Sequence, residues 1–302
     1  MSRNGIFLLV VPVALGLGAC SSAVYKQDGL LAQTTHKTGL INTQVTPDEE
    51  AQIGRDSAAT LLGAAPLLND PRLQNYVNKV GGWVAQNSET PGRTWQFGVL
   101  DSDAINAFAA PSGYVLITRG LVAVLNNEAE LAGVLAHEIA HVQQQHHLRQ
   151  IVQQRISKAL TGELLNTTAD TIAQQPFSRT LIGDTGNQAL KFSTNTVTGM
   201  VRFFTTDLYS NGLARSDELD ADRLGVVLAA RAGYDPFGLP AALQTLDSLN
   251  PDDPVLSLLF KTHPRPQERL QALESFMVTL PEDDTPTLGA ERFRKQADRY
   301  RR

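Results

Sequence analysis

Apolar residues recur at helical spacing along much of the chain. In "PRLQNYVNKVGGWVAQ" (71–86) they return every three or four positions, which places them on one face of a helix. Upstream, "TPDE" (46–49) combines a threonine N-cap, a proline suited to the first helical turn and a glutamate that completes a capping box. We therefore expect a helix that begins at Thr46 and a second helix over 71–86.

Two shorter stretches have the composition of strands. "TWQFGVLD" (94–101) and "YVLITR" (114–119) are rich in β-branched and aromatic residues, and a small-residue segment separates them. Further helical patterns cover 126–156, 217–232, 239–249 and 265–278. The predicted fold class is α+β, mostly helical with a small sheet.

Two segments depart from this regular pattern. Residues 157–215 are rich in Ser, Thr, Asn and Gln, and we predict an insertion that serves as a lid beside the main domain. Residues 281–302 are strongly charged and read as a tail. The domain itself is predicted to span 46–280.

The N-terminus has the pattern of a bacterial lipoprotein signal. Arg3 precedes an apolar run that ends in Leu-Gly-Ala-Cys, and Cys20 is the single cysteine of the chain. We interpret 1–19 as a signal peptide, Cys20 as the lipidated residue and 20–45 as a polar tether. The predicted location is the periplasmic side of the cell envelope, at the outer membrane, with the lipid as the membrane anchor.

Charge narrows the classes of partner. The formal net charge is −5 at pH 7 and no basic run is present. Nucleic-acid binders normally carry a basic patch or stripe, so we exclude nucleic acid as a partner.

Four of the six histidines lie in "GVLAHEIAHVQQQHH" (133–147). His137, Glu138 and His141 form the H-E-x-x-H pattern, in which the two histidines stack on one helical face and bind one metal ion while the glutamate acts as a base. His146 and His147 fall five and six positions past His141, so we interpret them as part of a solvated polar face.

A catalytic zinc usually takes three protein ligands, and two glutamates compete for the third place. Glu163 is the only glutamate in the polar insertion. Glu218 lies in "ARSDELDADRLG" (214–225), where Asp222 shares its helical face and can support a ligand histidine. We favour Glu218 for this reason, and we interpret Asp220, on the other side of that helix, as a surface charge.

The sixth histidine has two readings. His263 precedes Pro264 in "KTHPRPQERL", which places it at the start of a helix, either as an exposed cap or as a side chain that projects into a cleft. Arg269 follows six residues later. Spacing alone does not separate these readings.

Taken together, the motifs resemble those of gluzincin-type zinc metallopeptidases related to the CAAX prenyl proteases and HtpX, and within them the periplasmic BepA-like and LoiP-like lipoproteins. The matching segments are "NAFAAPSGYVLITRGL", "ELAGVLAHEIAHV", "ELDADRLG", "RAGYDP" and "THPRPQERL". Ser112 departs from the pattern, because a glycine is common at this place in the family.

This resemblance implies a zincin-like fold and one Zn²⁺ held by His137, His141 and Glu218, with Glu138 as general base and acid. It also implies that His263 approaches the metal, either as a fourth ligand that blocks the site or as a catalytic helper, and that Arg269 packs near this motif.

The activity implied by the resemblance is zinc-dependent endopeptidase cleavage of unfolded or misassembled envelope proteins. We expect the substrate backbone to pair with a free edge strand formed by Tyr114, Val115, Leu116, Ile117 and Thr118. Two alternatives stay open: a chaperone or assembly factor whose zinc site is closed by His263, and a small-molecule or peptidoglycan hydrolase with similar metal chemistry.

Overall fold

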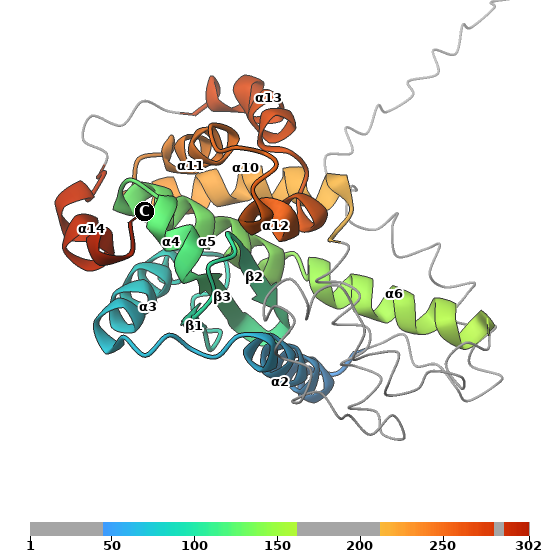
Figure 1. Cartoon of the computed structure of the whole chain (residues 1–302). Helices are drawn as coiled ribbons and strands as arrows, with labels where there is room; N and C mark the ends of the chain where they lie inside the picture. The colour runs from blue at the N-terminus through green and yellow to red at the C-terminus, as the bar shows by residue number, and fades with distance from the viewer. Residues whose placement is uncertain (1–44, 162–211, 281–286, 302) are drawn as a thin grey trace, which may run out of the picture. The chain divides into compact units, whose positions relative to one another are not determined.

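A computed structural model describes residues 45–161, 212–280 and 287–301 (Figure 1). The predicted signal peptide, Cys20 and almost all of the predicted lid lie outside these residues, as does the alternative ligand Glu163. The described ranges contain no helix long and apolar enough to cross a bilayer.

The helices and strands, in chain order, are α2 (Pro47–Ala64), α3 (Pro71–Gln86), β1 (Gln96–Leu100), β2 (Ala107–Ala110), β3 (Tyr114–Thr118), α4 (Arg119–Val124), α5 (Glu128–Gln143), α6 (His146–Thr161), α10 (Arg215–Arg231), α11 (Gly238–Asp247), α12 (Ser257–Thr262), α13 (Pro266–Met277) and α14 (Ala290–Ala297).

The predicted α+β class is confirmed, since helices dominate and the three strands form one sheet. The predicted capping box is also present: the Thr46 hydroxyl accepts from the Glu49 amide, and the Glu49 carboxylate accepts from the Thr46 amide. Helix α3 covers 71–86 as predicted and starts at the N-cap Asp70.

The sheet has the order β1-β3-β2, with β1 parallel and β2 antiparallel to β3. Strand β3 therefore uses both of its edges, and our expectation that Tyr114, Val115, Leu116, Ile117 and Thr118 form a free edge for substrate was wrong. The reason is β2, which was not predicted. Its sequence Ala-Phe-Ala-Ala lacks β-branched residues, and it pairs Ala107 with Ile117 and Ala110 with Tyr114.

Helix α5 runs through the centre of the fold (Figure 1). The sheet and α3 lie against one side of it, and α10 and α11 pack on the other. Every residue from Glu128 to Val142 is buried. This burial all around the helix explains why its apolar residues do not form a single stripe.

The helix predicted over 126–156 is two helices. Helix α5 ends at Gln143, and Gln145 has a φ of 53°, in the left-handed region that an α-helix cannot contain. The chain turns there, and α6 begins with His146. This turn decides where the last two histidines of the cluster point.

Part of the predicted C-terminal tail belongs to the core. Phe293 of α14 is fully buried and contacts the ring of Tyr76 on α3. Next to it, Arg292 forms an ion pair of 2.6 Å with Glu128, the first residue of α5, which also accepts hydrogen bonds from the hydroxyls of Tyr76 and Tyr234. The domain therefore extends beyond residue 280, because the charged side chains of this segment face outward while Phe293 faces the core.

Candidate metal centre

Helix α5 presents the three residues of the H-E-x-x-H pattern to one enclosed region. His137, Glu138 and His141 are each at most 3% exposed. One turn separates the two histidines, and their Nε2 atoms lie 3.0 Å apart. The helix is fixed at its start by Asn127, whose side chain accepts from the Glu130 amide as an N-cap.

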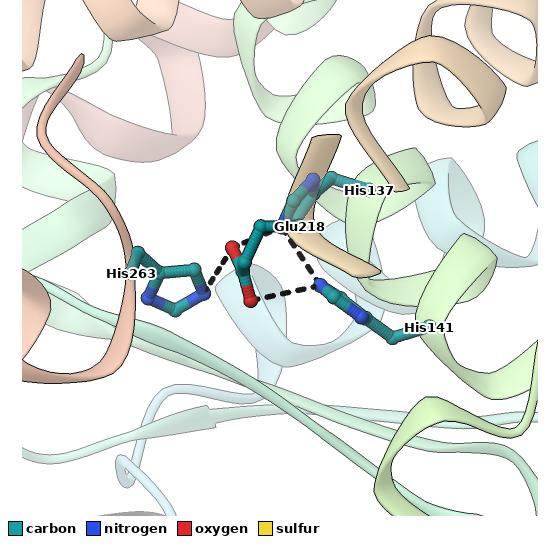
Figure 2. A group of neighbouring side chains, drawn as sticks. All are labelled: His137, His141, Glu218 and His263. Atoms are coloured by element: carbon teal, nitrogen blue, oxygen red, sulfur yellow. Dashed lines mark hydrogen bonds and ion pairs between the residues drawn. The ribbon is translucent and has the colours of Figure 1, made fainter. Parts of the chain in front are cut away.

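Helix α10 brings Glu218 to the same place. Its carboxylate lies 3.7 Å from Nε2 of His137 and 3.5 Å from Nε2 of His141 (Figure 2). The close approach of the two helices depends on Gly225, where a Cβ atom would lie 2.9 Å from the His137 amide nitrogen. This glycine of the "DRLG" sequence therefore positions the carboxylate as well as the helix.

His263 completes the group from the end of α12 (Figure 2). Its Nε2 lies 3.9 Å from Glu218 and 4.0 Å from Glu138. The hydroxyl of Thr262 donates to the Leu258 carbonyl, and it lies 2.9 Å from Nδ1 of His263. That hydroxyl can accept the Nδ1 proton, which leaves the lone pair of Nε2 directed at the group.

The donor set fits a zinc ion. One ligand atom from each of His137, His141, Glu218 and His263 lies within 4.8 Å of the other three. A tetrahedral zinc with bonds of about 2.0–2.2 Å holds its ligand atoms about 3.3–3.6 Å apart. The distances of 3.7 and 3.5 Å from the Glu218 carboxylate to Nε2 of the two histidines are close to this range. Within the described residues, Oε2 of Glu218 is buried and has no hydrogen-bond partner, which is costly unless a cation satisfies it.

A second carboxylate orients the first ligand histidine. Asp222 lies 2.9 Å from Nδ1 of His137, and Arg269 holds it through contacts of 2.5 and 2.9 Å. This carboxylate keeps the Nδ1 proton of His137 in place and directs Nε2 toward the metal position. The structure thus brings Asp222 and Arg269 to the positions we expected for supporting residues.

Burial and charge shift the protonation of these groups. Burial and the positive charge of Arg269 both act to lower the pKa of His137, but the hydrogen bond and charge of Asp222 outweigh them and raise it to about 9. Burial acts to raise the pKa of Asp222, but Arg269 and His137 hold it well below its usual range. In the metal-free site His137 therefore binds a proton that a metal must displace.

The pKa of Glu138 moves the other way. Burial, with help from the negative charge of Glu218, raises it to about 7. A carboxyl group that titrates near neutrality exchanges protons readily at physiological pH, which is what a general base and acid needs. The same burial lowers the pKa of His263 to about 4, so this side chain is neutral at pH 7.

A pocket opens beside these groups. Glu138, Glu218 and His263 line it, together with Ala107 and Phe108 of the outer strand β2. The strand next to the pocket is therefore β2 and not the predicted β3. Only the pairing of the strands reveals this, and spacing along the sequence carries no signal for it.

The interpretation of His146 and His147 as a solvated face was wrong. They are 3% and 9% exposed, and the turn at Gln145 folds both back onto His141. His147 also lines the pocket. By contrast, Asp220 is 63% exposed in its side chain, in agreement with its expected surface position.

Comparison with known proteins places this geometry in a family. The family model described as "Peptidase family M48" matches residues 71–277, more than half of the chain. The beta-barrel assembly-enhancing protease of Escherichia coli (strain K12) is 32% identical over 225 residues, which cover 74% of this chain and 42% of that protein. The protein of that name from Yersinia pestis is 33% identical over 231 residues, covering 74% and 43%.

A shorter relative matches along most of its length. Protease HtpX of Legionella pneumophila is 27% identical over 245 residues, which cover 71% of this chain and 80% of that protein. The chain spans less than half of the length of the beta-barrel assembly-enhancing proteases that it matches. The family model, which matches residues 71–277, nevertheless includes all four residues of the candidate metal centre. The chain belongs to peptidase family M48.

Proposed function

We propose that the chain is a zinc metalloendopeptidase with His137, His141 and Glu218 as the metal ligands and Glu138 as the general base and acid. One observation carries the proposal: Glu138 lies beside a buried group of metal-binding atoms, in a pocket lined by the outer strand of the sheet. Three protein ligands and one remaining position are typical of catalytic zinc.

The chemistry divides among the side chains. When bound, zinc would acidify a water molecule and polarise the scissile carbonyl. Glu138, a buried carboxylate that lines the pocket beside the metal position, takes the proton of the attacking water and delivers it to the nitrogen of the leaving amine. His263 faces the same space, and with its proton on Nε2 it can donate a hydrogen bond to the developing oxyanion.

The substrate backbone is proposed to run along β2. Ala107 and Phe108 line the pocket with Glu138, whereas β3 is enclosed between two strands. Pairing with an outer strand reads mainly the backbone of an extended peptide, which suits unfolded protein segments.

The proposed substrates are unfolded or misassembled proteins of the bacterial envelope. Two observations support this: relatives carry the name beta-barrel assembly-enhancing protease, and Cys20 follows a lipoprotein-type signal. We propose that lipid on Cys20 anchors the protein to the periplasmic side of the outer membrane. Cys20→Ser should then move the protein from the membrane fraction to the soluble fraction, and an unchanged distribution contradicts the anchor.

The decisive experiment compares the wild type with Glu138→Gln on unfolded casein. The variant should bind one zinc per chain, measured by atomic emission, and lose at least 100-fold in cleavage rate. Asp220→Asn, an exposed carboxylate that is lost without touching the site, is the matched control and should cleave as well as the wild type. Cleavage by Glu138→Gln at the wild-type rate would remove Glu138 from the mechanism.

His263 supports a second candidate function. It belongs to the same four-atom group, and structural zinc sites carry four protein ligands. A chain held in this closed state would act as an envelope chaperone or assembly factor with little proteolysis. His263→Ala should raise the cleavage rate if His263 blocks the metal, and should lower it if His263 assists the reaction. A zinc-loaded wild type that cleaves no unfolded protein favours the second candidate.

A further inference from the structure

The two ligand histidines receive unequal support from their surroundings. Nδ1 of His137 lies against the carboxylate of Asp222. Nδ1 of His141 instead lies 2.8 Å from Nδ1 of His146, and both rings are at most 3% exposed. A nitrogen pair at this distance, sealed from water, is a hydrogen bond, so one ring donates and the other accepts.

The direction of this bond follows from the metal site. His141 can offer the lone pair of Nε2 to a metal only if its proton is on Nδ1, because a neutral imidazole has one donor and one acceptor nitrogen. His146 must then accept at its own Nδ1, which places its proton on Nε2. The geometry thus links the tautomer of His146 to the metal-binding form of His141.

Asp217 holds His146 in the accepting tautomer. Its Oδ1 lies 3.8 Å from Nε2 of His146. In the accepting tautomer this nitrogen carries the proton, so the negative carboxylate faces the positive hydrogen of the N–H group. Arg149 forms an ion pair of 3.3 Å with the same oxygen of this carboxylate. Asp217 lies one residue before Glu218 on α10, so one helix supplies both a candidate ligand and the charge behind His146.

We propose that His146 is a positioning residue of the metal centre, which fixes the tautomer and ring orientation of His141, and that Asp217 fixes the tautomer of His146. The assignment rests on the proposed zinc site. His137 is supported directly by the carboxylate of Asp222. His141 is instead supported by the imidazole of His146, which is supported in turn by Asp217. Partners of this kind typically contribute 10–100-fold to metal affinity.

The test measures zinc affinity of the full chain by competition with a chromophoric chelator. All variants carry Glu138→Gln, so that the result does not depend on proteolysis. His146→Phe should bind zinc about 10–100-fold more weakly than the Glu138→Gln chain. His146→Asn should retain most of the affinity, because its side-chain oxygen can accept from His141 near the position of the lost Nδ1.

Two further measurements separate positioning from packing. Asp217→Asn should weaken zinc binding, while Asp220→Asn, on the same helix but exposed, should not. Nitrogen-15 spectra of the histidines in the metal-free chain should show His141 protonated on Nδ1, and this tautomer should become mixed in His146→Phe.

The outcomes distinguish the two proposals. Equal zinc affinity in His146→Phe and the parent, or equal loss in His146→Phe and His146→Asn, overturns the positioning role. Zinc binding with the expected order of affinities, but without casein cleavage by the wild type, overturns the peptidase and leaves the positioning role standing. A wild type that binds no zinc overturns both.

Discussion

Methionine in place of Arg269 would remove the guanidinium that holds Asp222 against His137. The pair is 6% and 1% exposed in its side chains and is joined by contacts of 2.5 and 2.9 Å. Methionine fills a similar volume but leaves the carboxylate of Asp222 buried with a weaker set of partners. Breaking a buried ion pair from one side costs about 3–5 kcal/mol, so we expect the free energy of unfolding to fall by this amount.

Urea unfolding followed by circular dichroism, in chelator at pH 7, measures this loss. The matched control is Arg223→Met, which removes an exposed arginine from the same helix as Asp222 and should change stability by no more than about 0.5 kcal/mol. Arg269→Met should also weaken zinc binding about 10–100-fold, because Asp222 no longer holds His137 in one orientation. A stability loss below about 1 kcal/mol with unchanged zinc affinity would refute this account of the pair.

Three further predictions follow from the geometry. The pKa of His137 is raised from 6.5 to about 9, which contributes about 3 kcal/mol to the stability of the metal-free protein. This contribution is fully present below pH 6.5 and is lost by pH 9. A free energy of unfolding in urea that stays constant between these pH values would contradict the prediction. Ser112 has a φ of 65°, so Ser112→Gly should stabilise the fold by about 0.5–1 kcal/mol in the same assay, and destabilisation would show that the serine side chain matters. Phe293→Ala should cost about 3–5 kcal/mol, whereas a free tail would give no change.

Most residues of the candidate metal centre could be selected from the sequence because they form pairs within single helices. His137 and His141 lie one turn apart, as do Glu218 and Asp222, and helical geometry alone places each pair on one face. His263 was different. Its approach to the group depends on α12 and on the contact with Thr262, and neither follows from local spacing.

The errors share a physical cause, which is that pairing and chain reversal are tertiary properties. Strand β2 is rich in alanine and is held in place by β3, so local propensity gave no sign of it. Glutamine is a good helix former, so nothing in "QQQ" predicted the left-handed Gln145 or the return of His146 to the site. Ser112 likewise adopts a left-handed backbone conformation that favours glycine, which its residue type did not predict.

Helix α5 is held at its start by side chains from remote parts of the chain and near its end by the first residue of the next helix. Glu128 contacts three distant residues, Tyr76 of α3, Tyr234 after α10 and Arg292 of α14, and His141 lies against His146 near the opposite end. The helix that carries the H-E-x-x-H pattern is therefore the most firmly held element of the domain. We expect its backbone amides to exchange with solvent more slowly than those of the other helices. We therefore expect any opening of the centre to come from the elements packed around α5, such as the end of α12 that carries His263, and not from α5 itself.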